Sequence, residues 1–560
     1  MVFGPMGRRL QERLLDGIFW NRRPLRHSMA LLNGQDLMDA GWRPSPQFRA
    51  ILDAAAEAES RGVRDRDYLL KLLERDFPRE APDKPGLRDQ AAPCGEAIMA
   101  VGQEEEVNLA GVRRAMGQLL RTPVIEAGAI LPDACPAGPG EAVIPVGGAI
   151  AARHAILPGA HSADICCSLW ATVFFSRQSA GEMLDDLLVV TRFGAGGRAP
   201  KDRVRHPVTD EAVWQNKFLQ GLQEHAEKHL ADQGDGNHFA YLGKLDLGKS
   251  FLTALEQAGH EEIVRPLLEA SRTRKEAYVL VTHHGSRGLG AQVYQRGHQA
   301  AIEETERIAS GIPKAAAWLD TRTGLGQEYW KALQYVSRWT KANHHTIHQR
   351  FLERAGAGRI TEFGNEHNFV WQRGDVFLHG KGATPAWKDD GGRPLLGLIP
   401  LNMAEPILIT LGSDNADHLS FCPHGAGRNR SRSATRRDFR GADGRLDEAL
   451  MEREIRKATR GLDIRWYHSK ADVTESPIGY KPAAQVRAQI AQFGLGKIIG
   501  EITPLGCIMA GDPGPRPWLR ERELTPKQKR AIEHRAERRQ MRRSLTHWDD
   551  ADDEEFGAPP

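Results

Sequence analysis

The chain has 560 residues, 40% of them hydrophobic, so it is long enough to bury a large core or several smaller ones. Its 76 basic and 73 acidic residues leave a formal charge of +3, which excludes a protein that binds nucleic acid through overall charge alone. Six cysteines without a CxxC pair, no bilayer-length apolar run and no signal-peptide pattern predict a cytoplasmic protein without a membrane segment.

Residues 1–95 are expected to form a helical accessory region. Apolar residues recur at helical spacing in segments 36–41, 46–62 and 65–77, and turn signals separate these segments. A stretch rich in proline and charged residues follows at 79–93 and is typical of a linker.

Residues 96–512 predict one mixed α/β domain. Strands are expected at 123–132, 168–175, 276–284, 367–372, 375–380 and 405–412, and helices at 212–232, 252–272, 292–310, 326–354 and 447–460. The irregular strand spacing argues against a doubly wound sheet. Residues 513–560 predict a basic helix and an acidic end, which form either a solvated tail or an arm that contacts RNA.

Four glycine-flanked segments carry side chains that can bind a metal ion or a phosphate. They are HSADICCSLW at 161–170, GDGNHF at 234–239, THHGSRGLG at 282–290 and GNEHNF at 364–369. Each histidine, taken alone, can also be structural. Five potential ligands in four similar settings instead indicate a metal and phosphate site, and their residues are Asp164, Cys167, His238, His283 and His367.

The segment FCPHGAGRNRSRSATRR at 421–437 places His424 among small residues and before several arginines. Gly425 and Gly427 would let the backbone approach an anion, and arginines bind phosphate through two parallel hydrogen bonds. His424 could therefore act as a nucleophile, a base or a metal ligand. The segment also fits an exposed loop rich in arginine and serine.

A competing motif lies at Gly243–Ser250, where GKLDLGKS has the spacing of a phosphate-binding P-loop. It would make the chain a P-loop NTPase. Bulky residues and an aspartate occupy the positions whose backbone amides should surround the phosphates, which argues against this interpretation.

Seven motifs resemble, in order, those of the RtcB family of RNA-splicing ligases over residues 120–511. They are DICC at 164–167, GNHF at 236–239, HHGSRGLG at 283–290, HNF at 367–369, HGKGAT at 379–384, IPLNM at 399–403 and HGAGRNRSR at 424–432. The resemblance implies a single large α/β catalytic domain of the RtcB type, here with a helical N-terminal extension and a basic tail. It also implies a ligase that uses GTP and manganese to join 2′,3′-cyclic phosphate or 3′-phosphate ends of RNA to 5′-hydroxyl ends, in RNA repair or tRNA splicing.

The resemblance also implies a role for each site residue. Cys167 would bridge two Mn²⁺ ions, one held with Asp164 and His238 and the other with His283 and His367, while His424 would carry GMP. The nucleotide would contact Asn237, Phe239, Asn368, Pro400, Asn402, Gly425, Ala426, Gly427 and Tyr480. Arg287, Lys381, Arg428 and Arg432 would bind the phosphates of RNA, with tRNA or rRNA fragments as substrates and a helper protein as activator.

The chain departs from the family pattern at several positions. Tyr241 replaces a carboxylate, and Met509 a lysine, that contact guanine in the family. Cys166 adds a thiol beside the expected ligand, and Cys135 stands where Asp133-Ala134 usually precede a histidine. An alternative is therefore a metal-dependent RNA phosphoesterase, or a nucleotide-binding paralogue, that does not ligate.

Overall fold

The computed structural model describes residues 30–42, 44–78, 84–137, 142–441 and 444–512. The expected basic helix and acidic end at 513–560 lie outside these residues. The chain divides between Lys84 and Pro85 into two compact units. Division into accessory (1–95), catalytic (96–512) and tail (513–560) regions stays a prediction.

The first unit is a small helical bundle, as the sequence predicts. Its helices are α2 (Gly34–Asp39), α3 (Phe48–Ser60) and α4 (Arg66–Asp76). The side chain of Asn33 caps α2 and that of Asp65 caps α4, which satisfies backbone N–H groups at both helix starts. Leu37, Ile51 and Leu69 meet in its core.

The second unit is built on two large sheets. In the described part of the chain, one sheet has the strand order β13-β14-β17-β6-β7-β5-β9, with β16 beside β17, and the other has the order β1-β2-β3-β11-β10. Two small sheets pair β12 with β15 and β4 with β8. The strands are β1 (Cys94–Glu96), β2 (Ile125–Cys135), β3 (Val146–Arg153), β4 (Ala155–Ile156), β5 (Ser168–Phe174), β6 (Phe239–Asp246), β7 (Glu276–His284), β8 (Leu319–Asp320), β9 (Arg359–Glu366), β10 (Asn368–Arg373), β11 (Val376–Lys381), β12 (Ala383–Pro385), β13 (Leu396–Ile399), β14 (Ile407–Gly412), β15 (Phe421–Pro423), β16 (Asp463–Trp466) and β17 (Gly496–Met509).

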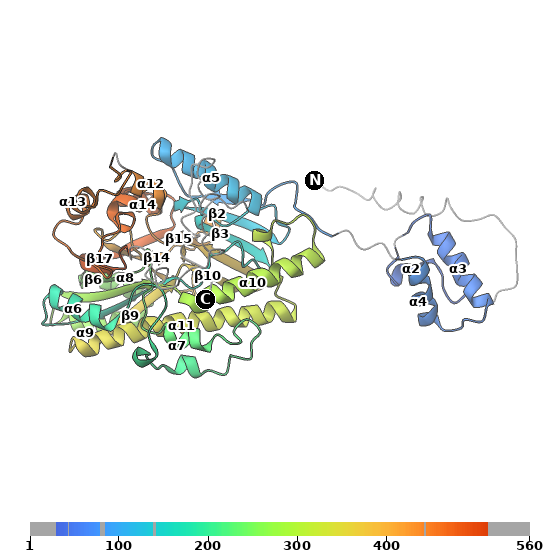
Figure 1. Ribbon diagram of the computed structural model, residues 1–560, viewed down its shortest axis with the longest axis horizontal. Coiled ribbons are helices and arrows are strands. Elements are labelled where there is room, and N and C mark those ends of the chain that lie inside the picture. The colour runs from blue at the N-terminus through green and yellow to red at the C-terminus, as the bar shows by residue number, and fades with distance from the viewer. Residues whose placement is uncertain (1–29, 43, 79–83, 138–141, 442–443, 513–560) are drawn as a thin grey trace, which may run out of the picture. The chain divides into compact units, whose positions relative to one another are not determined.

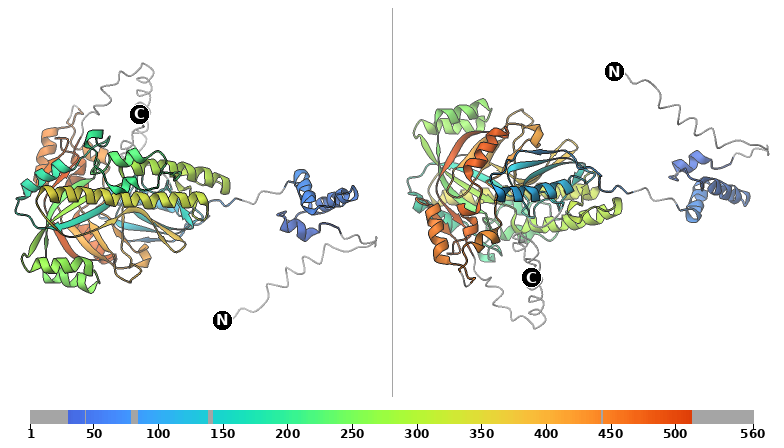
Figure 2. Two further views of the ribbon diagram at one scale, coloured as in Figure 1. Left: turned by 90° about the horizontal axis from the view of Figure 1, so that it is seen from below. Right: turned by 90° about the horizontal axis from the view of Figure 1, so that it is seen from above.

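Helices cover both faces of the larger sheet. Those of the second unit are α5 (Gln103–Leu119), α6 (Ala180–Val190), α7 (Gln223–Lys228), α8 (Lys249–Gln257), α9 (Glu261–Ser271), α10 (Arg287–Ile308), α11 (Gly324–Arg354), α12 (Arg432–Arg437), α13 (Glu448–Ala458) and α14 (Ala483–Gln492). On one face, α6 and α11 pack their apolar residues against Phe174 and Leu280. On the other face, α8 and α9 pack against Val173 and Val279. The long helices α10 and α11 run side by side (Figures 1 and 2).

The mixed α/β class is confirmed. The sheets are also not doubly wound, as expected, because a doubly wound sheet is mostly parallel and these sheets are mostly antiparallel. Only β1–β2 and β16–β17 pair in parallel among the strand pairs of the described residues, and the other pairs are antiparallel. None of the helices in the described ranges is long and apolar enough to cross a bilayer.

The prediction of a helix at 212–232 is mostly wrong. Residues 212–222 form successive turns, and only α7 is helical within 212–232. The Asn216 side chain accepts a hydrogen bond from the Phe218 N–H at 2.8 Å and donates one to the Glu328 carbonyl at 2.8 Å. Gly221 has a φ of 75°. These two hydrogen bonds of Asn216, one local and one long-range, and the left-handed conformation of Gly221 therefore replace the helix. Likewise, the single helix expected at 252–272 is broken at Gly259, where φ is 79°.

Candidate functional site

The ends of four neighbouring strands carry the predicted metal ligands. Cys167 and His238 directly precede β5 and β6, His283 lies near the end of β7, and His367 follows β9. Because β6, β7, β5 and β9 are successive antiparallel neighbours, the start of one strand lies beside the end of the next. Residues that are up to 203 positions apart in the sequence therefore meet at one edge of the sheet, as the numbering from 164 to 367 gives.

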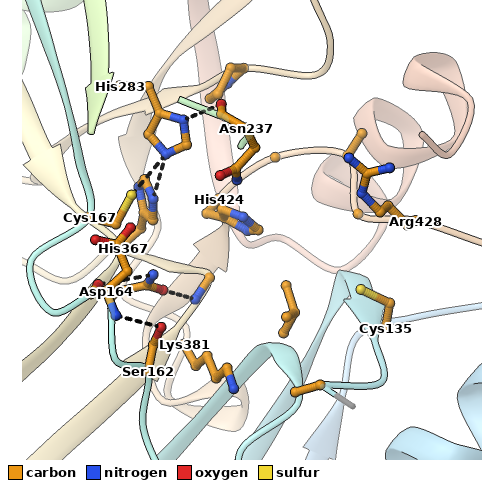
Figure 3. A pocket seen from close by; sticks show the side chains of 18 of the residues that line it. Cys135, Ser162, Asp164, Cys167, Asn237, His283, His367, Lys381, His424 and Arg428 are labelled. Atoms are coloured by element: carbon orange, nitrogen blue, oxygen red, sulfur yellow. Dashed lines mark hydrogen bonds between the residues drawn. The ribbon is translucent and has the colours of Figure 1, made fainter. Parts of the chain in front are cut away.

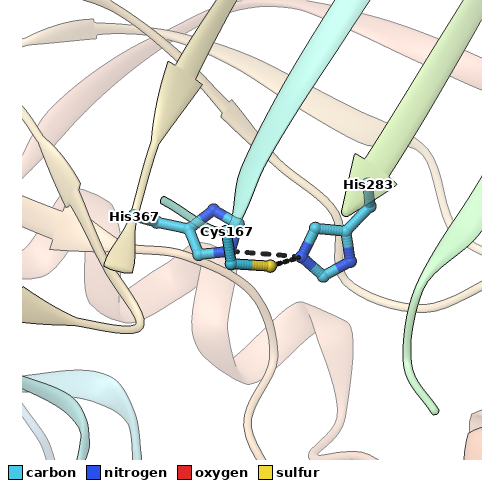
Figure 4. A group of neighbouring side chains, drawn as sticks. All are labelled: Cys167, His283 and His367. Atoms are coloured by element: carbon cyan, nitrogen blue, oxygen red, sulfur yellow. Dashed lines mark hydrogen bonds between the residues drawn. The ribbon is translucent and has the colours of Figure 1, made fainter. Parts of the chain in front are cut away.

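These side chains form two groups that share one sulfur atom. Cys167, His283 and His367 make one group, and Asp164, Cys167 and His238 make the other, with the ligand atoms of each group within 4.8 Å of one another. Cys167 Sγ lies 3.1 Å from His283 Nε2 (Figures 3 and 4). The same sulfur lies 3.5 Å from His238 Nε2. His367 Nε2 lies 3.1 Å from His283 Nε2. Such a donor set of thiolate, imidazole and carboxylate is suited to divalent transition metals.

The protonation states also suit a metal site. Burial, with the charges of His238 and His424, lowers the pKa of His283 to about 3. Burial would raise the pKa of Asp164, but the charge of His238 and its hydrogen bond outweigh this and lower it to about 2. The Nδ1–H of His283 donates to the Asn237 carbonyl at 3.2 Å, so its Nε2 lone pair faces the cluster. A carbonyl that fixes the tautomer in this way is a common feature around metal-binding histidines.

A buried hydrogen-bond chain holds α11 against the strands that carry two of these ligands. His344 bonds Ser168 Oγ at 2.9 Å and Thr282 Oγ1 at 2.6 Å, and Thr282 Oγ1 also bonds His348 at 2.8 Å. His348 continues to Thr172 Oγ1 at 2.7 Å. Because Ser168 and Thr282 adjoin Cys167 and His283 in sequence, this chain fixes the backbone from which both ligands project.

His424 follows β15 and lies beside the metal-ligand groups. Its ring centroid is 5.0 Å from that of His367 (Figure 3). Asp133, fully buried in β2, accepts hydrogen bonds through Oδ2 from His424 Nδ1 at 2.5 Å, from the His424 N–H at 3.1 Å and from the Gly425 N–H at 3.3 Å. Since the carboxylate only accepts, Nδ1 carries a proton, and in the neutral form of the ring Nε2 has the free lone pair. Sequence reasoning missed this role of Asp133, because 291 residues separate it from His424 and no local signal links them.

One cavity of about 560 Å³ joins the metal-ligand groups to His424, and its size suits a nucleotide. Nearly all the predicted site residues line it. They are Asp164, Cys167, Asn237, Phe239, His283, His367, Asn368, Lys381, Pro400, Asn402, His424, Gly425, Ala426, Gly427, Arg428, Arg432 and Tyr480. His238 is not among the described residues that line the cavity, and its Nε2 lies 3.0 Å from Asp164 Oδ2.

Arg287 is placed differently from the expectation, because it is not among the described residues that line the cavity. Its guanidinium packs against Gly234, where an added Cβ would lie 2.0 Å from Nη1. Burial would raise the pKa of Asp164 and of Asp232, but the interactions of each with a neighbouring histidine, together with the Arg287 charge, outweigh burial and lower both pKa values to about 2. A contact between Arg287 and RNA stays a prediction that the cavity wall does not support.

Arg428 and Arg432, which follow His424 in sequence, are both held by one buried carboxylate. Glu475 accepts hydrogen bonds from Arg428 Nη2 and Arg432 Nε, each at 2.9 Å, and from the Tyr480 hydroxyl at 2.8 Å. The Arg428 guanidinium lies 4.4 Å from the Tyr480 ring centroid. Arg428 thus covers one face of Tyr480, so only the other face of this ring could stack on a nucleobase.

One wall of the cavity is apolar where base-reading residues were expected. Tyr241 pairs with Cys507, and Phe239 with Met509, between β6 and β17, and all four side chains line the cavity. The Tyr241 hydroxyl donates to the Ile502 carbonyl at 2.8 Å. The tyrosine is therefore a packed part of the sheet, and its polar atom is already used.

Two other features of the sequence are structural. Residues 243–246 of the P-loop motif are paired within β6, and the exposed Lys249 starts α8, so no phosphate-binding loop separates this strand from the helix and the P-loop interpretation is wrong. Cys166 belongs to the hydrophobic core that contains Tyr329 rather than to either metal-ligand group, so its thiol is directed away from the site.

Comparison with known proteins agrees with these motifs. A family model described as tRNA-splicing ligase RtcB matches residues 117–510. The chain is similar to the tRNA-splicing ligase RtcB of Pyrococcus furiosus, with 26% identity over 365 residues, covering 58% of this chain and 34% of that protein. The enzyme of the same name from Thermococcus kodakarensis is 25% identical over 425 residues, covering 65% and 84% respectively. The RNA-splicing ligase RtcB of Mycobacterium tuberculosis is 25% identical over 303 residues, covering 50% and 67%.

The chain spans only about a third of the length of the curated Pyrococcus relatives, between 34% and 38%. The family match nevertheless covers most of the chain and nearly coincides with the region of the seven motifs. The chain therefore belongs to the RtcB family.

Proposed function

We propose that this protein is an RNA ligase that joins 3′-phosphate or 2′,3′-cyclic phosphate ends to 5′-hydroxyl ends through a nucleotidylated His424. The relatives from Pyrococcus and Thermococcus are named tRNA-splicing ligases, which supports RNA as the substrate. Fragments of tRNA or rRNA as the source of this RNA are part of the proposal. A cytoplasmic location and activation by a helper protein belong to the same proposal.

The observation that carries the proposal is that one cavity brings three features together. They are His424 with its partner Asp133, the two metal-ligand groups, and the side chains of Arg428 and Arg432. A histidine beside a metal pair and cationic side chains is suited to attack a phosphoryl group whose charge is neutralised on several sides. None of these elements alone would distinguish a ligase from a metalloprotein of another kind.

The residues fit two divalent ions. Each group of three ligands would hold one ion, and Cys167 belongs to both groups. The carboxylate of Asp164 would supply the kind of oxygen ligand that suits Mn²⁺. When bound, the ions would neutralise the charge of the triphosphate and of the RNA phosphate. Asn368 supports the site by accepting a hydrogen bond from the Gly382 N–H at 2.6 Å, which orders the turn beside His424.

His424 would act through Nε2. Asp133 holds the Nδ1 proton, so Nε2 attacks the α-phosphate of the nucleotide and pyrophosphate leaves. As the ring gains positive charge, the Asp133 carboxylate stabilises it. The nucleotidyl group then passes to the RNA 3′-phosphate, and the 5′-hydroxyl displaces the nucleoside monophosphate. Lys381, Arg428 and Arg432 would bind the phosphates along this path.

We propose GTP as the nucleotide, with the apolar wall of Phe239, Tyr241, Cys507 and Met509 as a surface for the base. This wall would bury a base but offers no side-chain carboxylate to accept the N–H groups of guanine.

The test is covalent labelling. Nucleoside triphosphates labelled at the α-phosphate are incubated with protein and Mn²⁺, and the bound label is counted after denaturation. We expect an acid-labile label with GTP that is absent from His424→Ala. Equal labelling of His424→Ala would refute the nucleophile, and preferential labelling with another nucleotide would refute GTP.

The apolar base wall also favours a second candidate, a metal-dependent RNA phosphoesterase that does not ligate. Such a protein would use the metal groups to open a cyclic phosphate and would need no guanine site. Opening of the cyclic phosphate without sealing, with each of the four nucleotides, would support this candidate over the ligase.

A further inference from the structure

Lys481 is a fully buried cation whose contacts surround the partner of His424. Its side chain is 0% exposed, and its ammonium lies 2.7 Å from Glu105 Oε1, itself in a side chain that is 1% exposed. The same ammonium donates to the carbonyl of Pro132 at 3.1 Å and to that of Ala134 at 3.0 Å. These two carbonyls stand on either side of Asp133.

The segment that Lys481 holds lacks regular strand pairing. The register of β2 with β3 is interrupted between Ile130 and Cys135, so the residues between them lie outside the hydrogen-bonded ladder. Carbonyl groups buried there need another donor. Lys481 supplies it to both carbonyls, and this fixes the direction in which the Asp133 side chain projects.

Lys481 also contacts the segment that carries His424, the partner of Asp133. Its backbone N–H donates to the Gly427 carbonyl at 3.0 Å, three residues after His424. Gly427 packs so closely that an added Cβ would lie 2.0 Å from the Asp133 carbonyl oxygen. One residue therefore contacts both segments whose separation sets the 2.5 Å hydrogen bond between Asp133 and His424.

Glu105 is anchored in turn, which makes the arrangement rigid. Its Oε2 accepts hydrogen bonds from the Val101 N–H and from Gln485 Nε2, each at 2.7 Å. A buried ion pair is expensive to desolvate, and apolar residues of the same size commonly stabilise a fold as well or better. Stability alone therefore does not account for this pair, whereas donation to the Asp133 segment does.

We propose that Lys481, charge-balanced by Glu105, is the positioning residue that sets the Asp133–His424 pair. It touches neither substrate nor metal and acts through Asp133. The proposal rests on the proposed function for its kinetic readout, but it also makes a structural prediction that needs no activity.

The test compares the double variant Lys481→Met/Glu105→Gln with a matched control, Gln489→Met. Gln489 is also buried, lies on α14 and forms hydrogen bonds with the backbone of Met99 at 2.7 and 3.1 Å, away from residues 132–134. The double variant removes both charges together, so it leaves no unpaired buried ion. Both proteins are compared with the wild type in full length. The proton spectrum is recorded without Mn²⁺, because this paramagnetic ion would broaden protons of the nearby His424, and the labelling rate is measured with Mn²⁺.

The first readout is the downfield proton resonance of His424 Nδ1–H, identified by its loss in His424→Ala. We expect the wild type and Gln489→Met to show it and the double variant to lose it. The second readout is the rate of His424 labelling at saturating nucleotide. We expect it to fall about 10²-fold in the double variant, as for a displacement of about 1 Å, with the KM for the nucleotide unchanged.

The proposal would be overturned by a double variant that has the melting temperature of Gln489→Met and keeps both the His424 resonance and the wild-type labelling rate. If it fails to fold, Lys481→Arg keeps the charge and changes the donor geometry, and a normal labelling rate in that variant would overturn the proposal equally. If the wild type shows the resonance but never labels, the proposed function fails, while loss of the resonance in the double variant still supports the positioning role.

Discussion

The Asp133→Asn substitution tests the proposed chemistry most directly. It keeps the size of the buried side chain and removes the charge 2.5 Å from His424 Nδ1. At an effective dielectric of about 20, a full charge on the ring at this distance would gain about 7 kcal/mol from the carboxylate. The amide oxygen can still accept a hydrogen bond, so we expect roughly half of this gain to be lost, about 3–4 kcal/mol. This corresponds to labelling of His424 that is about 10²–10³-fold slower.

The assay is single-turnover labelling with Mn²⁺ and nucleotide, and the melting temperature of each variant controls for unfolding. Because Asp133 bonds His424 and Gly425 and belongs to neither metal-ligand group, we expect the amount of bound metal to stay unchanged. A well-folded Asp133→Asn protein that labels within threefold of the wild-type rate would refute the role that we assign to this carboxylate.

Three further predictions concern the metal site, pH stability and backbone packing. Cys167→Ala removes the sulfur atom shared by both groups, so we expect bound Mn²⁺ to fall by more than half in elemental analysis after dialysis. Burial would raise the pKa of Glu475, but Arg432 and Arg428 outweigh it and lower the pKa from 4.5 to about 2. The carboxylate therefore adds about 3 kcal/mol of stability above pH 5, which is lost as the pH falls toward 2; the wild-type midpoint in urea should drop more steeply between pH 6 and 3 than that of Glu475→Gln. Gly427 has a φ of 69°, and Gly427→Ala would place a Cβ 2.0 Å from the Asp133 carbonyl oxygen. We therefore expect a lower melting temperature and the loss of His424 labelling in this variant.

Matched variants serve as controls for these predictions. Cys166→Ala should keep its metal, and equal metal loss in both cysteine variants would contradict the assignment of Cys167. A Glu475→Gln protein with the wild-type dependence on pH would show that the carboxylate is not the titrating group. Gly444 has a φ of 75° with open space around it, so Gly444→Ala should cost only about 1 kcal/mol. Equal effects of the two glycine substitutions would contradict the packing argument.

The expected strands at 168–175 and 276–284 agree closely with β5 and β7, because long apolar runs with β-branched residues have few other stable conformations. The expected helix at 212–232 was mostly wrong because the Asn216 side chain bonds both the nearby Phe218 N–H and the distant Glu328 carbonyl, and these bonds compete with the helix. The P-loop motif failed for a similar reason, since the pairing of Gly243 and its neighbours in β6 depends on strands β7 and β17.

The sequence alone was enough to identify the family and to predict the ligand residues, because each expected ligand sits in a short glycine-flanked motif whose spacing is local. Only the tertiary structure decided how these residues work together. Cys167 became the shared atom of two groups because antiparallel strands bring opposite ends together. Asp133 and Lys481 gained their roles through contacts across 291 and about 350 residues, distances over which no local pattern of side chains carries information.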